Sequence, residues 1–150
     1  MSTGRRHYED VQVGEAHVSP SITITEAHIV QFAGISSDFS RLHMDEEYGK
    51  TSIFGTRVAH GLLGLAITDG LKGRTDAFRV EGLASLGWTW DFAGPIRIGD
   101  TVTVHFKVAR KRETRKPDQG IVYLACELMN QRGEVVHRGE HRLMVKRKCE

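Results

Sequence analysis

A glycine-rich helix is the sequence feature that most constrains the fold of this chain. Residues 60–73, HGLLGLAITDGLKG, carry apolar side chains at helical spacing, and Lys72 and Gly73 stand where such a helix ends. Three glycines within it each lower helical stability by up to about 1 kcal/mol relative to alanine: Gly61, Gly64 and Gly70. Close wrapping by a sheet would compensate, because a residue without a side chain lets another backbone approach. We therefore expect the helix to be enclosed.

Four strand-like segments follow this helix. Residues 83–92 and 102–108 alternate between apolar and polar side chains, and residues 121–128 and 134–145 form the third and fourth segments. Glycine, proline, aspartate and asparagine in the connections provide turns. Short connections favour an antiparallel meander. The sequence therefore predicts an α+β fold with an antiparallel sheet wrapped around one long central helix.

The chain before the helix is less regular. Residues 18–25 are predicted as a strand, and Thr25 is placed to cap a short helix that ends at Gly34. The apolar residues on one side of that helix are Ile29, Phe32 and Ala33. Residues 35–43 have neither the helical nor the strand period, so we expect a loop, and loops on rigid scaffolds often carry chemistry.

Length and composition favour a single domain over residues 1–150. A chain of 150 residues can build one core, whereas two domains would each be marginal in size. No run approaches the roughly 18 apolar residues that a membrane span needs, and no signal-peptide core follows the N-terminal arginines, so we expect a cytoplasmic protein without membrane contact. Cys126 and Cys149 form no CxxC pair, which supports neither a disulfide framework nor a zinc site.

The net charge of +2 reflects two basic runs, KRETRK at 111–116 and KRK at 146–148. Such runs could contact nucleic acid or the phosphates of a cofactor. A solvated hairpin tip and a frayed tail explain them more simply. Neither an RNP-type aromatic motif nor a zinc finger accompanies them, so we expect no nucleic-acid partner.

Two segments carry most of the candidate chemistry: residues 32–48, FAGISSDFSRLHMDEEY, and residues 54–65, FGTRVAHGLLGL. In the first, Asp38 is followed five positions later by His43 and then by Asp45. With the HGLL helix start and the later segment WDFAGPIRIGDT at 90–101, their order and spacing resemble the MaoC-like family of (R)-specific enoyl-CoA hydratases.

The resemblance implies a hot-dog fold, in which the helix from His60 is the central element. It also implies a homodimer or higher homo-oligomer that binds an acyl-CoA at the subunit interface. The implied activity is reversible addition of water to a trans-2-enoyl-CoA, giving a 3-hydroxyacyl-CoA. Asp38 and His43 would be catalytic, with no metal and no cofactor other than the CoA of the substrate.

Hydration of a 2-enoyl thioester needs a base for the water, a proton for C2 and donors for the thioester oxygen. Asp38 and His43 could hold one water between them, and because their titrations would be coupled, either could be the base. The N–H groups that open the helix at His60 and Gly61 are candidate oxyanion donors. Tight packing explains Gly61 equally well, and we expect His60 mainly to bond backbone.

Two positions depart from the family pattern. Ser40 and Arg41 stand where Asn-Pro is usual; Ser40 can still bond near the water, and Arg41 suits a carboxylate on the acyl group or a CoA phosphate. Ala66 stands where some such hydratases carry a serine, with Thr68 and Asp69 as nearby substitutes.

Two other functions remain open for a chain of this kind. A hot-dog thioesterase would use the same fold and ligand but release free CoA thiol, and the spacing of Asp38 and His43 suits a hydratase better. A catalytically inactive acyl-CoA-binding subunit would bind the ligand without converting it.

Overall fold

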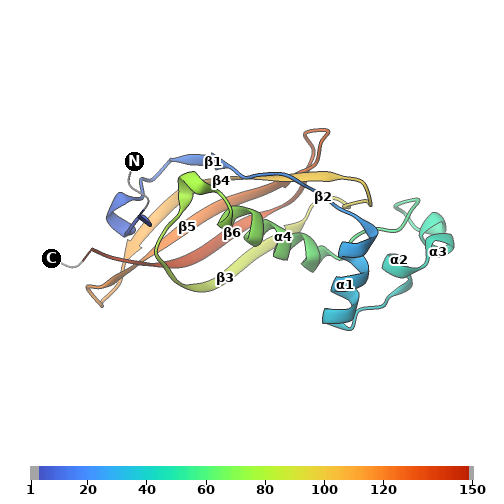
Figure 1. Cartoon of the computed structure of the whole chain (residues 1–150), viewed down its shortest axis with the longest axis horizontal. Helices are drawn as coiled ribbons and strands as arrows, with labels where there is room; N and C mark the ends of the chain where they lie inside the picture. The colour runs from blue at the N-terminus through green and yellow to red at the C-terminus, as the bar shows by residue number, and fades with distance from the viewer. Residues whose placement is uncertain (1–3, 149–150) are drawn as a thin grey trace.

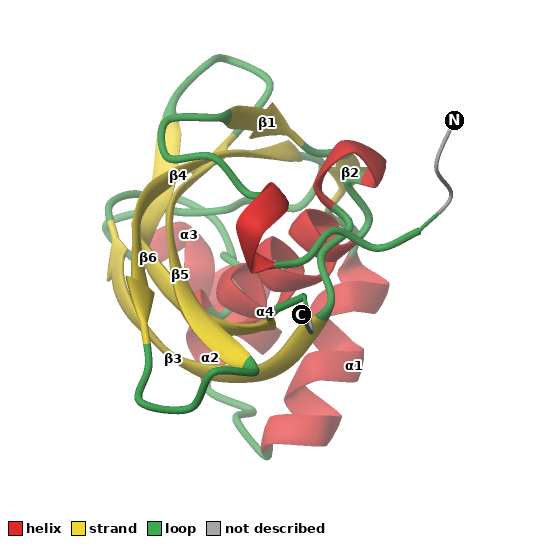
Figure 2. Cartoon of the chain, turned by 90° about the vertical axis from the view of Figure 1, so that its left-hand side faces the viewer, coloured by secondary structure: helices red, strands yellow, loops and turns green. Residues whose placement is uncertain are grey.

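The computed structural model describes residues 4–148, in which one curled antiparallel sheet surrounds one long helix (Figure 1, Figure 2). The helices are η1 (Tyr8–Asp10), α1 (Glu26–Ser36), α2 (Arg41–Met44), α3 (Glu46–Thr51), α4 (Gly61–Gly73) and η2 (Asp76–Phe78). The strands are β1 (Ala16–Val18), β2 (Ile22–Thr23), β3 (Gly82–Phe92), β4 (Thr101–Glu113), β5 (Gln119–Met129) and β6 (Val135–Lys146).

The central helix α4 has the predicted bounds, and Figure 2 shows the sheet curving around it. Two of its glycines are explained by close contacts. A Cβ atom at Gly61 would lie 2.6 Å from the Phe92 ring, and one at Gly64 would lie 2.3 Å from the His137 ring. Nothing lies within 4 Å of a Cβ at Gly70. The enclosure is therefore confirmed for the first half of the helix and does not account for Gly70.

The sheet order is β1-β4-β5-β6-β3, with β2 pairing beside β1 on β4. The predicted meander is right for β4, β5 and β6 but wrong for β3, which pairs with β6. Residues 93–100 carry the chain across the end of the sheet. Their backbone groups form hydrogen bonds with the backbone of Val136, then of Ala59, then of Ile24. Eight residues can span roughly 26 Å, so a short connection does not require neighbouring strands.

The strand predicted over residues 18–25 is divided in two. β1 ends at Val18 and β2 begins at Ile22, and Pro20 lies between them. Proline has no N–H to give to a ladder, which interrupts pairing at this point. Ser19 replaces part of the lost pairing, because its hydroxyl accepts a 2.9 Å hydrogen bond from the N–H of Val104.

Helix α1 begins as predicted and ends later. Thr25 is its N-cap, and the N–H of Thr25 donates to Nδ1 of His28 at 3.0 Å. The predicted end at Gly34 is wrong, because the helix continues to Ser36 and Ser37 adopts a left-handed conformation with φ of 64°. A glycine inside a helix costs only about 1 kcal/mol, which the buried face of α1 can offset.

One cluster of buried apolar side chains forms the core between α4, α1 and the sheet. The alternation of β4 is confirmed, since its buried residues are Val102, Val104, Phe106 and Val108. Among residues 4–148, no helix is both long enough and apolar enough to cross a bilayer.

The basic C-terminal segment is ordered as far as Lys148, so the expected frayed tail is wrong for this part. Arg147 pairs with Glu9 at 2.8 Å and with Glu113 at 3.5 Å, while the Lys148 ammonium pairs with Asp10. Two of the three basic residues of this run are therefore paired, mainly with acidic residues of the one-turn helix η1. The C-terminal segment is thereby tied to η1, and Figure 2 shows the C-terminus close to the one-turn helices.

The two cysteines differ in what the structure describes. Cys126 is a free thiol buried in β5, and burial raises its pKa to about 12. The thiol therefore remains protonated at neutral pH. Cys149 lies outside the described residues.

Candidate active site

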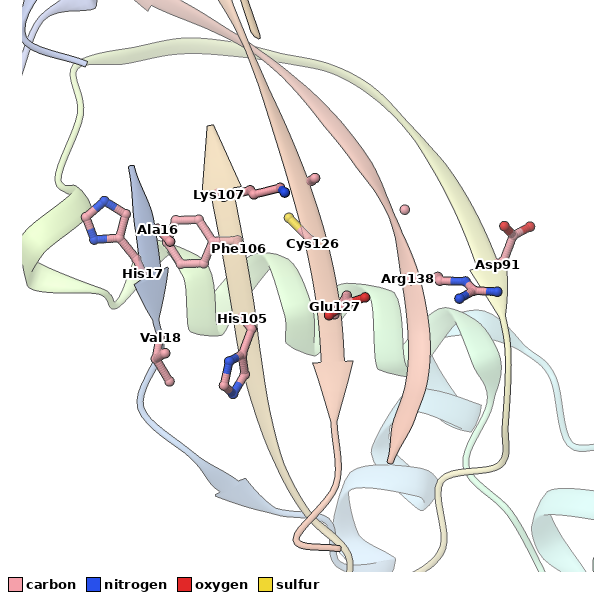
Figure 3. A pocket seen from close by; sticks show the side chains of 12 residues that line it. Ala16, His17, Val18, Asp91, His105, Phe106, Lys107, Cys126, Glu127 and Arg138 are labelled. Carbon is pink, nitrogen blue, oxygen red and sulfur yellow. The ribbon is translucent and has the colours of Figure 1, made fainter. Parts of the chain in front are cut away.

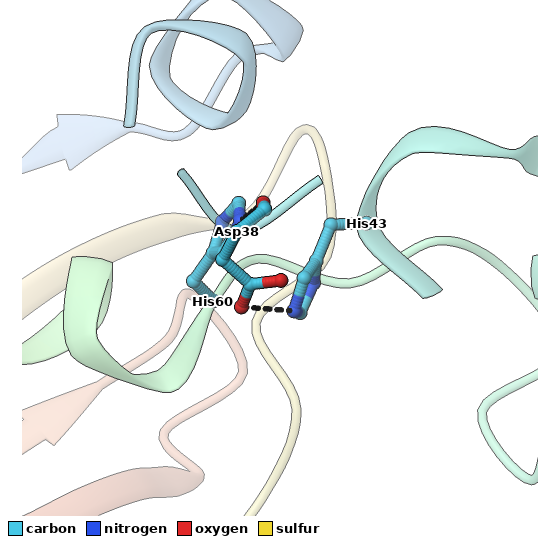
Figure 4. Close-up of side chains that lie close together, drawn as sticks. All are labelled: Asp38, His43 and His60. Carbon is cyan, nitrogen blue, oxygen red and sulfur yellow. Dashed lines mark hydrogen bonds and ion pairs between the residues drawn. The ribbon is translucent and has the colours of Figure 1, made fainter. Parts of the chain in front are cut away.

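The predicted catalytic residues meet where the segment after α1 passes the beginning of α4 (Figure 4). The loop predicted over residues 35–43 is shorter than expected. Residues 35–36 complete α1, and residues 41–44 form the single turn α2, closed by a hydrogen bond from the N–H of Met44 to the carbonyl of Ser40. His43 therefore lies on a helical turn, and Asp38 lies in the four irregular residues that precede it.

Asp38 and His43 face each other across 3.8 Å, measured between Oδ2 and Nε2 (Figure 4). His43 is buried, whereas half of the Asp38 side chain is exposed. Nδ1 of His43 lies 2.7 Å from the carbonyl oxygen of Val58, which can only accept, so Nδ1 carries the proton. The lone pair of neutral His43 is therefore on Nε2, the atom that faces the carboxylate. The structure thus brings together the two residues that the sequence predicts as the catalytic pair.

Asp38 is held in its charged form. The backbone N–H of Ser40 donates to its Oδ1 at 3.1 Å, and this bond is the main reason why the pKa of Asp38 is lowered from its ordinary value. The nearby imidazoles of His43 and His60 contribute in the same direction. Ser40 thus supports the site through its backbone, in addition to any contact that its hydroxyl makes with a substrate.

His60 touches both members of the pair. Its Nε2 donates a 2.8 Å hydrogen bond to the backbone carbonyl of Asp38, and its ring stacks on the His43 ring with 3.8 Å between centroids. The edge of Phe32 closes the other side at 5.0 Å. The prediction that His60 bonds backbone is confirmed. Its contact with His43 was missed, since nothing in the spacing of residues 43 and 60 signals a stacked pair.

Gly61 opens α4 beside these residues. The Phe92 ring lies where a side chain at Gly61 would have to go, which supports the packing interpretation of this glycine. N–H groups in the first turn of a helix have no carbonyl partner earlier in that helix. The same glycine can therefore be needed for packing and still offer a donor to a ligand, and the donor role stays a prediction.

Arg41 is turned toward its own helical neighbours. Its Nε and Nη2 donate to Oδ2 of Asp45 at 3.1 and 2.9 Å, and its guanidinium lies over the Tyr48 ring at 4.6 Å. Within residues 4–148 no ion pair joins Arg41 to Asp38. Asp45 also caps α3 by accepting from the N–H of Tyr48. The structure thus places Arg41 and Asp45 in a local pair beside the site.

The two residues offered as substitutes for a serine at position 66 are engaged elsewhere. The Thr68 hydroxyl is buried and donates to the carbonyl of Gly64 at 2.8 Å. Asp69 lies 3.0 Å from the ammonium of Lys72. Neither side chain takes part in the group around Asp38.

Asp38, His43 and His60 also have the composition of a metal site, with one ligand-type atom from each within 4.8 Å of the others. Each imidazole uses one nitrogen on a carbonyl, as metal-bound histidines do. The remaining nitrogen of His60, Nδ1, is buried and has no hydrogen-bond partner. Because Nε2 of His60 donates to a carbonyl, this Nδ1 carries the free lone pair of the ring, and the expectation that the site holds no metal stays a prediction.

A separate hollow of about 600 Å³ crosses the sheet away from this group (Figure 3). It is lined from β1, β4, β5, β6 and β3, and its exposed charged side chains include Lys107, Glu127, Arg138 and Asp91. None of Asp38, His43 and His60 lines it. The candidate catalytic group therefore lies outside this hollow.

Comparison with known proteins gives the same family as the motifs. Residues 10–127 match the family described as MaoC like domain. The chain is 36% identical over 99 residues to an (R)-specific enoyl-CoA hydratase of Rhodospirillum rubrum, and this match spans 65% of each protein. It is 33% identical over 146 residues to a 3-hydroxybutyryl-CoA dehydratase of Methylorubrum extorquens, covering 96% of this chain and 87% of that enzyme.

A solved structure supports the fold. The MaoC-like dehydratase from Rhodospirillum rubrum superimposes with a TM-score of 0.88 at 32% identity, covering 97% of this chain and 99% of that one. These matches indicate the same family as two features of the structure, namely the helix enclosed by an antiparallel sheet and the Asp38–His43 pair. The chain belongs to the MaoC-like domain family and has its hot-dog fold.

Proposed function

We propose that the protein is an acyl-CoA hydratase or dehydratase that adds water reversibly to a trans-2-enoyl-CoA, giving an (R)-3-hydroxyacyl-CoA. The observation that carries the proposal is the facing pair of Asp38 and His43, 3.8 Å apart, with a carboxylate on one side and an unprotonated Nε2 on the other. The names of the relatives, an enoyl-CoA hydratase and a hydroxybutyryl-CoA dehydratase, support the same reaction class.

Both atoms of the pair are acceptors, so a water can donate one proton to each. As the water oxygen bonds to C3, one of its O–H bonds breaks and the pair takes that proton. The C2–C3 π electrons move toward the thioester, and C2 then receives a proton from the pair. The pair ends with the protonation state in which it began. Because both groups face the same water, we assign the acid and base roles to the pair and not to either residue alone.

Charge that develops on the thioester oxygen needs donors in place before the reaction. The first-turn N–H groups of α4, at Gly61 in particular, lie beside the pair and would supply them together with the positive end of the helix dipole. The proposal requires no metal and no cofactor, since Asp38 and His43 perform the proton transfers. Dialysis against a chelator should leave the activity unchanged.

The proposal includes a homodimer, with the acyl-CoA bound at the subunit interface, acting in the cytoplasm. β3 is the edge of the sheet beyond β6, and it exposes large apolar side chains: Leu83, Leu86 and Phe92. A long apolar edge strand is a natural pairing surface for a second copy. The start of α4 lies against Phe92, so an interface on this edge would border the candidate site.

The test is a spectrophotometric assay with enoyl-CoAs and 3-hydroxyacyl-CoAs of several chain lengths. Asp38→Asn and His43→Gln should each lower turnover by about 100- to 10,000-fold, the usual effect of removing general acid-base catalysis. The circular dichroism spectrum of each variant should match that of the wild type. Normal turnover in both variants would contradict the proposal, release of free CoA thiol would indicate a thioesterase, and binding without conversion would indicate an inactive subunit.

A further inference from the structure

A second polar cluster lies at the opposite end of α4 from the candidate active site. Lys72 and His141 are both buried there, and their Nζ and Nδ1 atoms are 2.7 Å apart. On the other side of the imidazole, Nε2 lies 2.7 Å from the hydroxyl of Ser85 on β3. Since α4 is 13 residues long, this cluster is about 20 Å along the helix from His60. The reaction proposed above does not use it.

The two hydrogen bonds that link Lys72, His141 and Ser85 are both donated in the direction of Ser85. An ammonium group has only donors, and that of Lys72 lies 3.0 Å from the Asp69 carboxylate and 2.7 Å from Nδ1 of His141, so Lys72 donates to Nδ1 of His141. Burial first, and the Lys72 charge second, lower the pKa of His141 to about 4, so the ring is neutral and its single proton is on Nε2. His141 therefore donates to the oxygen of Ser85.

Ser85 is left as a donor. Its oxygen accepts from His141, so its own proton is free to point outward, and within residues 4–148 no other hydrogen bond involves this hydroxyl. Trp88 stacks on the His141 ring at 4.1 Å with 9° between the planes, which fixes the imidazole in this orientation. The arrangement is unlike a Ser-His-Asp triad, in which the histidine accepts the serine proton. Ser85 is thus polarised to donate and is not activated as a nucleophile.

The hydroxyl opens onto a hollow of about 840 Å³ with a cationic lining. Four cationic side chains and two carboxylates line it: Arg5, Lys72, Arg74, Arg79, Asp69 and Asp76. Arg79 pairs with Asp76 at 2.6 Å, and Arg5 reaches Glu81 only at 3.9 Å. Among the described residues, Arg74 forms no side-chain ion pair. A donor hydroxyl, an unpaired guanidinium and a net positive lining together favour a compact anion of more than one negative charge.

We propose that this hollow is a binding site for a phosphate group, free or carried by a nucleotide, and that Ser85 and Arg74 contact it. A phosphate carries up to two negative charges at neutral pH and offers several acceptor oxygens, which match a serine hydroxyl and a planar guanidinium. Lys72 and His141 act from behind, by keeping Ser85 oriented as a donor. A monocarboxylate has half this charge and is expected to bind more weakly.

The experiment is isothermal titration of the full chain with inorganic phosphate, adenosine 3′,5′-bisphosphate and acetate. Phosphate should bind, and acetate should bind about tenfold more weakly or not at all. If the bisphosphate binds more tightly than phosphate, the site takes a nucleotide; if the two bind equally, it takes the free ion. Either result supports the proposal. No binding of either phosphate compound at millimolar concentration would overturn it, as would equal binding of acetate.

Variants separate this site from general charge effects. Ser85→Ala and Arg74→Ala should each weaken phosphate binding by about 5- to 10-fold, the worth of one hydrogen bond or charge-assisted contact. Ser85→Thr, which keeps the hydroxyl, should restore binding and also shows whether Ser85→Ala acts through folding. Arg138→Ala is the matched control, because Arg138 is an exposed arginine of β6 that lines the other hollow. A loss of binding in Arg138→Ala equal to that in Arg74→Ala would overturn the proposal.

Discussion

His60 controls the geometry of the proposed catalytic pair by two different contacts. Its hydrogen bond to the carbonyl of Asp38 fixes the backbone from which the carboxylate projects, and its stacked ring restricts how His43 can tilt. His43 is held from its other nitrogen by the carbonyl of Val58. The distance between the two facing atoms is thus set by two residues outside the pair, His60 and Val58, which contact no substrate atom in the proposed reaction.

The variant His60→Leu replaces the imidazole by an apolar side chain of similar bulk, and so removes the hydrogen-bond donor to the carbonyl of Asp38. Misplacement of a catalytic group by a fraction of an ångström to 1 Å typically costs about 10- to 100-fold in rate. We expect kcat to fall by roughly this factor while KM changes little, because His60 positions the pair and does not bind substrate. Steady-state kinetics with one enoyl-CoA would measure both constants.

His105→Leu is the matched control for this variant, since His105 is exposed on β4. It should leave kcat unchanged. A wild-type kcat in His60→Leu would mean that Val58 and the local turn alone position the pair. A rise in KM with normal kcat would instead place His60 in direct contact with the substrate.

The sequence was informative about this site only where its members are close along the chain. Asp38 and His43 are five residues apart, and they were predicted because this spacing, with the motifs around it, resembles the MaoC-like pattern. His60 is 22 residues from Asp38, and its bond to that carbonyl depends on how α4 enters the sheet. Arg41 suggested a substrate contact because a guanidinium suits carboxylates and phosphates; its pairing with Asp45 depends on the helical turn α2, which the sequence did not predict.

At the scale of elements, α4 allows a direct test of why its glycines are present. Gly61→Ala would place a Cβ atom 2.6 Å from the Phe92 ring, and because Phe92 is 57% exposed its ring can partly move aside, so we expect a loss of about 1 kcal/mol in the free energy of unfolding, the low end of the usual cost of overpacking. Gly70→Ala meets nothing within 4 Å and should instead stabilise the protein by about 0.5–1 kcal/mol. Urea denaturation of the two variants would measure both changes.

These two substitutions change the same residue type in the same helix, so each is the control for the other. Equal effects would mean that helix propensity alone decides them and that the close approach of the sheet does not matter. Phe92→Leu in the Gly61→Ala background should recover part of the lost stability, because a smaller side chain can move away from the added methyl group.

The long strands and the central helix were predictable from periodicity, and so was the pairing of β4, β5 and β6, but the place of β3 in the sheet was not. The alternation at Val102, Val104, Phe106 and Val108 identifies one buried face whatever strand lies beside it. The position of β3 depends on the path of residues 93–100 across the sheet end, which is decided by backbone hydrogen bonds to three separate segments. Such bonds leave no period in the sequence.

At the scale of the whole molecule, the contact between η1 and the C-terminal segment should make stability depend on pH. The N–H of Lys148 first, and the guanidinium of Arg147 with it, lower the pKa of Glu9 from 4.5 to about 2. A carboxyl group whose pKa is depressed by folding stabilises the folded state above its unfolded pKa, and that contribution is lost as the pH falls. We expect the free energy of unfolding to decrease between about pH 4.5 and pH 2.

Glu9→Gln should remove part of this dependence, measured by urea denaturation at several pH values. Because Glu9 is about one-third exposed, the effect should be modest and should shrink at high salt. Glu127→Gln is the control, since Glu127 is exposed on β5 and forms no ion pair with another described residue. An identical pH profile in wild type and Glu9→Gln would contradict the assignment.

The proposed homodimer predicts that two copies of the molecule pair through β3. β3 has eleven residues at one edge of the sheet, and Leu86 on it is 36% exposed in the isolated chain. If two β3 edges pair antiparallel about a twofold axis, residues near the middle of the strand face their own copies, so Leu86→Glu would bring two new carboxylates close to each other. Like charges at an interface cost several kcal/mol, so dimerisation should weaken by about 100-fold or more.

Val18→Glu is the matched control, because Val18 is 56% exposed on β1, at the opposite edge of the same sheet. Sedimentation over a range of concentrations should give a dimer for the wild type and for Val18→Glu, and a monomer at low concentration for Leu86→Glu. Since the substrate is proposed to bind at the interface, kcat/KM of Leu86→Glu should also fall on dilution. A Leu86→Glu dimer as stable as the wild type would exclude pairing through β3, and a monomeric, fully active wild type would remove the dimer from the proposed function.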